Sequence, residues 1–157
     1  ATGLNMRLFD GMPIVVDGER IDVADSVAYR GMLLSGIPNW AMAIGYTTSS
    51  WTLKVSLMCR YFVDLVKHMD ANGYDRAVPV AVPGMVRKPV MDLQAGYAKR
   101  GQPFVPKQGE GAPWQMAMSY PEDAKALRGP VADEHLQFGR SRTADARDAE
   151  RRPSRVR

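Results

Sequence analysis

Residues 40–54 read WAMAIGYTTSSWTLK, and this stretch predicts a β-strand that leads into an α-helix. Residues 40–44 are an uninterrupted apolar run, which is typical of a parallel strand buried on both faces. The hydroxyl side chains of residues 47–50 offer caps for a helix over residues 51–71, and Asn72-Gly73 is a suitable end for it. We expect its apolar stripe to comprise Val55, Met58, Phe62, Leu65 and Met69. Strand, turn and helix together predict a β-α unit of the dinucleotide-binding type, and therefore an α/β fold.

The start of the predicted helix is the position in this stretch best suited to binding a ligand. The first turn of a helix leaves backbone N–H groups unpaired and carries a partial positive charge, which suits an anion or an electron-rich carbonyl. The N–H groups in question belong to Trp51, Thr52 and Leu53. Either they face a cofactor, or Ser49 or Ser50 simply caps the helix. Gly45 likewise either lets a ligand approach the backbone or only permits a turn.

Short strands joined by turns are predicted before this unit, over residues 5–30. The apolar segments 14–16 and 21–23 flank Asp17-Gly18-Glu19-Arg20. The Asp-Gly pair supplies the positive φ angles that tight hairpin turns need. We therefore expect a β-hairpin here.

Proline recurs at short intervals after residue 78, so long regular elements are not expected in that part of the chain. Short helices are predicted at residues 91–100 and 121–128, and Trp114 and Tyr120 are expected to anchor the segment on the preceding domain. The expected organisation is part of a domain over residues 1–82, a Pro-rich wrapping extension over 83–138 and an Arg-rich tail over 139–157.

The formal net charge of +4 resides in the tail. Residues 139–157 contain seven of the 21 basic residues and three of the 17 acidic ones, which leaves fourteen of each in residues 1–138. The tail has no aromatic residue and cannot bury enough apolar surface to offset the entropy of ordering. We expect a disordered end rather than a nucleic-acid site.

Side chains that could act in catalysis or bind a metal are few and scattered. Cys59 is the only cysteine, which excludes an internal disulfide and fits a reducing compartment. His68 and His135 do not make a metal site, and a hydrolase triad built on Asp133 and His135 lacks a nucleophile elbow. The methionines are expected in the core, although Met32 could line a substrate pocket.

Three segments of the sequence are similar to a known family. They are Ala1-Thr2-Gly3, Ser35-Gly36-Ile37-Pro38-Asn39 and residues 45–54, GYTTSSWTLK. Together they resemble the C-terminal part of a flavin-containing monooxygenase of the Baeyer–Villiger type (class B). The similarity covers residues 1–82 and continues more patchily from Ala95 to Trp114, where it points to the mycobacterial ethionamide-activating subgroup.

The resemblance implies that the cofactors are FAD and NADPH, and that the chain is the C-terminal portion of a Rossmann-like FAD-binding domain with an extension. In this family the Ala-Thr-Gly segment lies where the two nucleotide-binding domains meet. The later helix start lies against the pyrimidine edge of the flavin, where its backbone donors would stabilise negative charge. The cofactor-binding residues that the resemblance implies are Ala1, Thr2, Gly3, Gly45, Tyr46, Thr47, Trp51, Thr52 and Leu53.

The reaction implied by the resemblance needs parts that this chain does not contain. NADPH reduces FAD, oxygen adds to the flavin, and the resulting peroxyflavin attacks a ketone or a thioether or thioamide sulfur. The glycine-rich fingerprints, the His-containing signature and the active-site Arg of the family have no counterpart here. We therefore expect no catalytic residue in this segment and no tight FAD binding by the chain alone. Its expected partner is the missing N-terminal half of the same protein.

The alternative is a small non-enzymatic domain whose Trp, Tyr and Arg residues bind a protein or an acidic surface. No signal peptide or membrane-spanning stretch is evident in the sequence. We expect a cytoplasmic location and no nucleic-acid partner. The Arg-rich tail leaves peripheral contact with an anionic membrane open.

Overall fold

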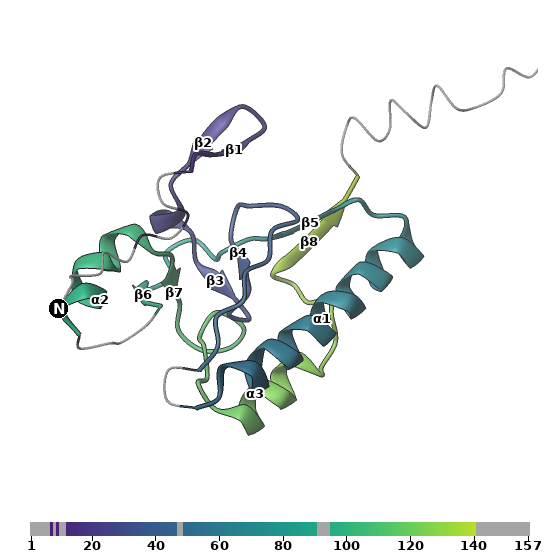
Figure 1. The fold of residues 1–157 in the computed structure, drawn as a ribbon. Helices are drawn as coiled ribbons and strands as arrows, with labels where there is room; N and C mark the ends of the chain where they lie inside the picture. Colours follow the sequence, from purple (N-terminus) through teal and green to yellow (C-terminus); the bar gives the residue numbers. More distant parts are fainter. Residues whose placement is uncertain (1–6, 8, 10–11, 47–48, 91–94, 141–157) are drawn as a thin grey trace, which may run out of the picture.

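The computed structural model describes residues 7, 9, 12–46, 49–90 and 95–140. Within these residues the fold is mixed α/β, with three α-helices and four two-stranded antiparallel sheets (Figure 1). Four predicted site residues, Ala1, Thr2, Gly3 and Thr47, lie outside the described residues. The same holds for all of the Arg-rich tail except Gly139 and Arg140.

The predicted hairpin is present at the N-terminal side of the fold. Strands β1 (Ile14–Val16) and β2 (Glu19–Ile21) pair antiparallel around Asp17-Gly18. These two turn residues have φ angles of 52° and 89°, as the Asp-Gly pair predicts. The second strand begins earlier than expected because the turn has only two residues. Val23–Asp25 consequently forms a short 3-10 helix, which is capped by the side chain of Asp22.

The other three sheets are one local hairpin and two pairings between segments further apart in the sequence. They pair β3 (Ala28–Tyr29) with β4 (Leu33–Leu34), β5 (Arg76–Pro79) with β8 (Leu136–Gly139), and β6 (Lys88–Pro89) with β7 (Lys107–Gln108). An isolated bridge between Val27 and Lys107 adds a further contact of this kind. Residues after position 83 are therefore joined to the preceding part by backbone pairing.

The long helix α1 (Trp51–Asn72) confirms the predicted helix, including its end. Gly73 adopts the left-handed conformation at φ 65°, and its N–H meets the carbonyls of Asp70 and Met69. The predicted apolar stripe is only partly right, because Phe62 is 41% exposed. The buried residues of α1, which we call the inner stripe, are Lys54, Leu57, Met58, Tyr61 and Leu65.

The buried strand predicted at residues 40–44 does not form. The only pairing of this segment is an isolated antiparallel bridge between Ala41 and Leu33, and Ala41 and Ala43 are exposed. A strand buried on both faces needs a neighbouring strand on each side. Among the described residues the only strand that pairs with this segment is β4. The predicted β-α unit is therefore present as a helix preceded by an extended segment.

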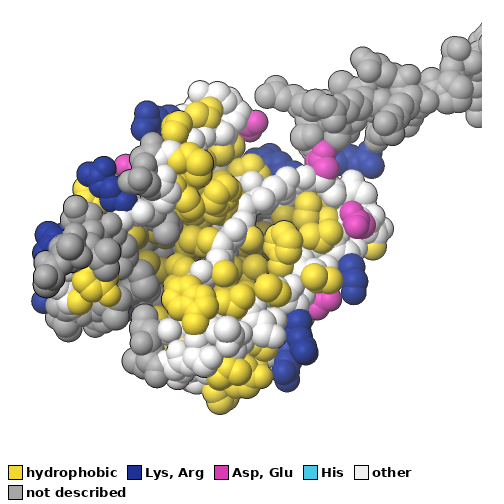
Figure 2. Space-filling view, viewed as in Figure 1, with side chains coloured by type: hydrophobic (Ala, Val, Ile, Leu, Met, Phe, Trp, Pro, Cys, Tyr) yellow, Lys and Arg dark blue, Asp and Glu magenta, His cyan; other side chains and the backbone are white. Residues whose placement is uncertain are grey.

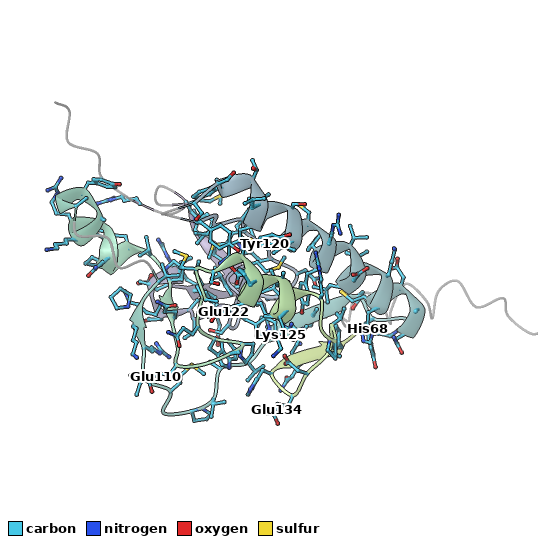
Figure 3. All side chains as sticks on the ribbon, turned by 90° about the horizontal axis from the view of Figure 1, so that it is seen from below. His68, Glu110, Tyr120, Glu122, Lys125 and Glu134 are labelled. Atoms are coloured by element: carbon cyan, nitrogen blue, oxygen red, sulfur yellow. The ribbon has the colours of Figure 1, made fainter. Side chains whose placement is uncertain are left out.

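The short helices flank the strands, and the core lies between them and α1. Helix α3 (Tyr120–Leu127) confirms the helix predicted at 121–128 and lies alongside α1 (Figure 3). Helix α2 (Gly96–Gly101) overlaps the predicted segment 91–100, of which residues 91–94 lie outside the described residues. Trp114 is 3% exposed and packs in the core as predicted. Tyr120 is 41% exposed, so its predicted anchoring role is wrong; as the first residue of α3 it faces solvent.

Candidate functional site

The first turn of α1 has no side-chain cap from the residues that the structure describes. Ser50 occupies the N-cap position, but its side chain makes no hydrogen bond to the helix backbone. Its Oγ instead lies 2.9 Å from Oγ1 of Thr52. The N–H of Leu53 donates to the carbonyl of Ser50 at 3.3 Å. Capping by Ser50 is therefore excluded. Among the described residues no side chain caps the helix, and because the Leu53 N–H is bonded to Ser50, the donors left at the helix start are the N–H groups of Trp51 and Thr52.

Gly45 lies directly beneath this helix start. A Cβ atom at this position would overlap the ring of Trp51 and would lie 2.8 Å from the Trp51 Cα. The space that a side chain would need at Gly45 is thus taken by α1 itself, and the role of Gly45 in cofactor binding stays a prediction. Trp51, Thr52 and Leu53 are exposed, whereas Gly45 and Tyr46 are buried.

A buried charge pair lies one turn further into the helix. Lys54 is 0% exposed, and its Nζ lies 3.1 Å from Oδ2 of Asp123 on α3. The same Nζ lies 5.2 Å from the centre of the Tyr46 ring. The contact between Lys54 Nζ and Asp123 Oδ2 is an ion pair whose geometry is not that of a hydrogen bond. The Tyr46 hydroxyl has no hydrogen-bond partner among the described residues. Burial, and then the neighbouring Asp123, raise the pKa of Tyr46 above its usual value.

The Lys54–Asp123 pair connects the helix start to the segment after residue 83. Burying a lysine is costly unless its charge is paired, and a cation near a helix N-terminus opposes the helix dipole. The pair therefore fixes the position of the α1 start relative to α3. Sequence reasoning missed Lys54 because a charged residue is not expected on the buried face of a helix. Its spacing to Leu57 and Met58 would have placed it on the inner stripe.

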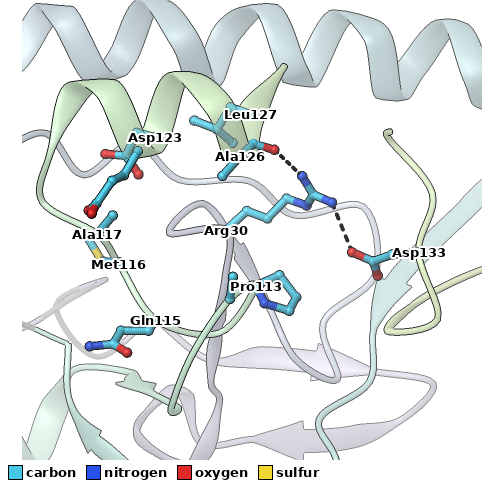
Figure 4. A pocket seen from close by; sticks show the side chains of 11 residues that line it. Arg30, Pro113, Gln115, Met116, Ala117, Asp123, Ala126, Leu127 and Asp133 are labelled. Atoms are coloured by element: carbon cyan, nitrogen blue, oxygen red, sulfur yellow. Dashed lines mark hydrogen bonds and ion pairs between the residues drawn. The ribbon is translucent and has the colours of Figure 1, made fainter. Parts of the chain in front are cut away.

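A pocket of about 610 Å³ opens beside this pair (Figure 4). Asp123 lines it together with Met116, Gln115 and Leu127, and Arg30 and Asp133 lie at its other side. Three carboxyl groups and one guanidinium therefore border it, namely those of Glu122, Asp123, Asp133 and Arg30. This pocket had no counterpart in the sequence-based expectations.

The charged residues on the far side of the pocket form a network that holds the chain itself. Arg30 donates to the Ala126 carbonyl at 2.6 Å, to the Pro130 carbonyl at 3.2 Å and to Oδ2 of Asp133 at 3.0 Å. The Tyr29 hydroxyl donates to the same Asp133 oxygen at 2.6 Å. Because these donors are directed at protein acceptors, the network is structural. Sequence reasoning could not pair residues that lie about a hundred positions apart.

The hydrogen bonds of this network set the pKa of Asp133. Burial alone would raise the pKa of this carboxyl group. Hydrogen bonds from the Tyr29 hydroxyl, the His135 N–H and Arg30 outweigh burial and hold the pKa below its usual value. Burial is also the main reason why the pKa of Tyr29 is raised. Asp133 is therefore ionised and accepts hydrogen bonds from three residues at neutral pH.

The remaining candidate residues are not brought together. Met32 is 2% exposed in the core, so its place in a substrate pocket stays a prediction. His68 packs against the rings of Tyr74 and Phe138, whereas His135 lies beside Trp114. In the part of the chain that the structure describes, no three His, Cys, Asp or Glu residues are grouped as metal ligands would be. No helix in the described ranges is long and apolar enough to cross a membrane.

Comparison with known proteins places this geometry in context. The chain is 42% identical over 143 residues to the FAD-containing monooxygenase EthA of Mycobacterium tuberculosis, a match that covers 89% of this chain and 29% of that protein. It is 39% identical over 146 residues to EthA of Mycolicibacterium smegmatis, covering 92% and 30% respectively. It is 38% identical over 136 residues to the "Probable FAD-binding monooxygenase AlmA" of Acinetobacter baylyi, covering 85% and 27%.

These relatives define the class of protein. Over most of its length the chain is homologous to one part of the FAD-containing monooxygenases, as the sequence resemblance predicts. It spans about 29% of the length of the M. tuberculosis protein, so it corresponds to a part of such an enzyme. No family model matches the sequence, and no solved structure matches it.

Proposed function

We propose that this chain forms the C-terminal part of an FAD- and NADPH-dependent monooxygenase. The observation that carries the proposal is the 42% identity over 89% of the chain to an FAD-containing monooxygenase. In this proposal residues 1–82 complete a Rossmann-like FAD-binding domain, and residues 83–138 wrap it. Bound FAD, reduced by NADPH, would supply the chemistry that transfers one oxygen atom from O2 to a ketone or a sulfur atom.

The described residues support the proposed contact of the α1 start with one edge of the flavin. The start of α1 presents backbone donors without a capping side chain, and the side chains of Trp51, Thr52 and Leu53 are exposed around it. Such donors suit an electron-rich carbonyl, and they would stabilise negative charge there. The sequence contains no Gly-x-Gly-x-x-Gly motif to hold a pyrophosphate. In our proposal the phosphates of both cofactors are bound by the part of the monooxygenase sequence that this chain does not match.

The functional test is a chimera of EthA from M. tuberculosis in which this chain replaces the segment to which it aligns. We expect the chimera to retain FAD after purification and to consume oxygen in the presence of NADPH. The chain alone is expected to retain no flavin. A soluble, folded chimera that is colourless and inactive would count against the proposal.

The role of the helix start can be tested by removing one backbone donor. Ser50 has φ −58° and ψ 120°, a conformation that a following proline accepts, so Trp51→Pro keeps the helix and deletes one N–H. Trp51→Ala removes the same ring but keeps the N–H, and it is therefore the matched control. A hydrogen bond to a charged group is worth about 1.5–3 kcal/mol.

We therefore expect Trp51→Pro to weaken FAD binding by the chimera at least about tenfold relative to Trp51→Ala. Its flavin reduction potential should also be lower, because the reduced flavin loses a donor. Flavin titration and reduction-potential measurements check both. Identical values for the two variants would remove Trp51 from the site.

A further inference from the structure

A second apolar stripe runs along α1 on its solvent side. It consists of Val55, Cys59, Phe62 and Val66, whose spacing of four, three and four residues places them on one line of the helix surface. Phe62 and Val66 are 41% and 39% exposed, and Cys59 is also exposed. We call this the outer stripe. It lies next to the inner stripe, so apolar side chains cover more than half of the helix circumference.

A helix that packs on one side only does not need such a wide apolar surface. An apolar arc of about 100° is enough for a helix with one buried face, and a wider arc is typical of a helix enclosed on more than one side. The charged residues of the central part of α1, Arg60, Asp64 and Lys67, gather on the remaining narrow face. The helix pattern therefore indicates that α1 is covered on two sides, of which the described residues cover one.

A small notch in the surface adjoins the outer stripe. It has a volume of about 120 Å³ and lies between α1, β4 and β5. Its walls include Phe62, Val66 and Met69 of α1, Leu33 of β4 and Ala77 of β5, and none of its lining residues is charged. Hydrophobic side chains gather on this face between the strands and α1 (Figure 2). Contiguous apolar surface of this kind marks a binding surface for another polypeptide.

We propose that the outer stripe and the notch bind polypeptide from the part of the monooxygenase sequence that this chain does not match. This inference rests on the proposed function. The partner surface is uncharged and aliphatic or aromatic, because the notch offers no polar group other than the amide of Asn39. The relatives support this choice of occupant over a second copy of the chain. More than two thirds of the length of each relative compared lies outside the match.

Cys59 provides a direct probe of whether the outer stripe is covered. Its thiol is exposed in this chain, and thiol labelling follows exposure. We expect rapid labelling of Cys59 in the isolated chain and labelling at least about tenfold slower in the EthA chimera, measured on the Cys59 peptide by mass spectrometry. A cysteine introduced by Val15→Cys at the hairpin, where Val15 is 58% exposed, is the control and should label equally in both.

A second variant pair tests the same surface without chemical labelling. Val66→Asp places a charge in the proposed contact, whereas Val15→Asp makes the same change on the exposed hairpin. We expect Val66→Asp to cause loss of soluble, folded chimera while leaving the isolated chain as soluble as the wild type. Val15→Asp should change neither protein.

The outcomes separate this inference from the proposed function. Equal labelling of Cys59 in a flavin-loaded chimera would overturn the docking surface and leave the proposed function standing. Protection of Cys59 in a colourless chimera would support the docking surface while the proposed function fails. Protection in the isolated chain, together with a dimeric mass in solution, would assign the stripe to a second copy and overturn the proposal.

Discussion

The structure requires glycine at both position 45 and position 73, for two different physical reasons. At Gly73 the requirement is conformational, since its φ of 65° is a left-handed angle that side chains disfavour. At Gly45 the requirement is steric, because a Cβ atom there would overlap the ring of Trp51. Gly73 ends α1, and Gly45 leaves the space in which α1 begins. The sequence pattern predicted the role of Gly73, whereas for Gly45 it left a turn and a ligand contact open and did not indicate the contact with Trp51.

We predict that Gly45→Ala destabilises the chain by about 1–3 kcal/mol, the usual cost of overpacking a tightly filled site. The methyl group must displace Trp51 and thereby the first turn of α1. The measurement is urea unfolding of the isolated chain. Gly139→Ala is the control, because a Cβ there meets nothing within 4 Å and should leave stability almost unchanged. Equal stability of the two variants would contradict this account of Gly45.

At the scale of elements, local patterns predicted what local interactions decide. The hairpin depends on Asp17-Gly18, and α1 depends on its own periodicity and on Gly73, so both could be predicted from neighbouring residues. The buried strand at residues 40–44 could not be, because its burial depends on strands elsewhere. The buried face of α1 was partly misassigned for a different reason: with two apolar stripes, periodicity alone does not say which one faces the core.

The candidate site shows the same division. The helix start at Trp51 was predicted because a helix N-terminus can be recognised locally. The attachment of this helix start through Lys54 and Asp123 was not predicted, since the two residues lie 69 positions apart, on different helices. The network of Arg30 and Asp133 was missed for the same reason. Long-range pairing of charges leaves no local mark in a sequence.

The buried pair between α1 and α3 predicts an asymmetric effect of substitution. Lys54→Met leaves Asp123 buried without its partner and should destabilise the chain by about 3–5 kcal/mol. The double variant Lys54→Met/Asp123→Leu removes both charges and should recover most of that loss. Urea unfolding of the single and double variants is the measurement. If the double variant is as unstable as Lys54→Met, an unpaired Asp123 is not the cause.

At the scale of the whole molecule, contacts between residues far apart in the sequence hold the two parts of the chain together. The Tyr29 hydroxyl and Arg30 donate to Asp133, and β5 pairs with β8. The segment after residue 83 therefore contributes to the same core as α1. This integration is consistent with the match to the relatives, which covers 89% of the chain rather than its first half alone.

The Asp133 contact predicts a pH dependence of stability. Its pKa is lowered in the folded chain, so the stabilisation by the carboxylate is complete above the ordinary pKa of about 4 and is lost as the pH falls through the folded pKa. Asp133→Asn cannot ionise and should be less stable by about 1–2 kcal/mol at pH 7. The difference from the wild type should persist to pH of about 5 and close below about 4.

Urea midpoints of the wild type and Asp133→Asn at several pH values check this prediction. Glu134→Gln is a suitable control, because the Glu134 side chain is 86% exposed and should contribute little at any pH. A difference between the wild type and Asp133→Asn that grows as the pH falls would contradict the assignment.

The hydrogen bonds from Arg30 to the carbonyls of Ala126 and Pro130 make the stability of α3 depend on a distant turn. Helix α3 has eight residues, too few to persist by itself in water. The end of that helix is held by a side chain from the turn between β3 and β4, about a hundred residues earlier in the chain. We therefore expect α3 to become stable only after it contacts that turn.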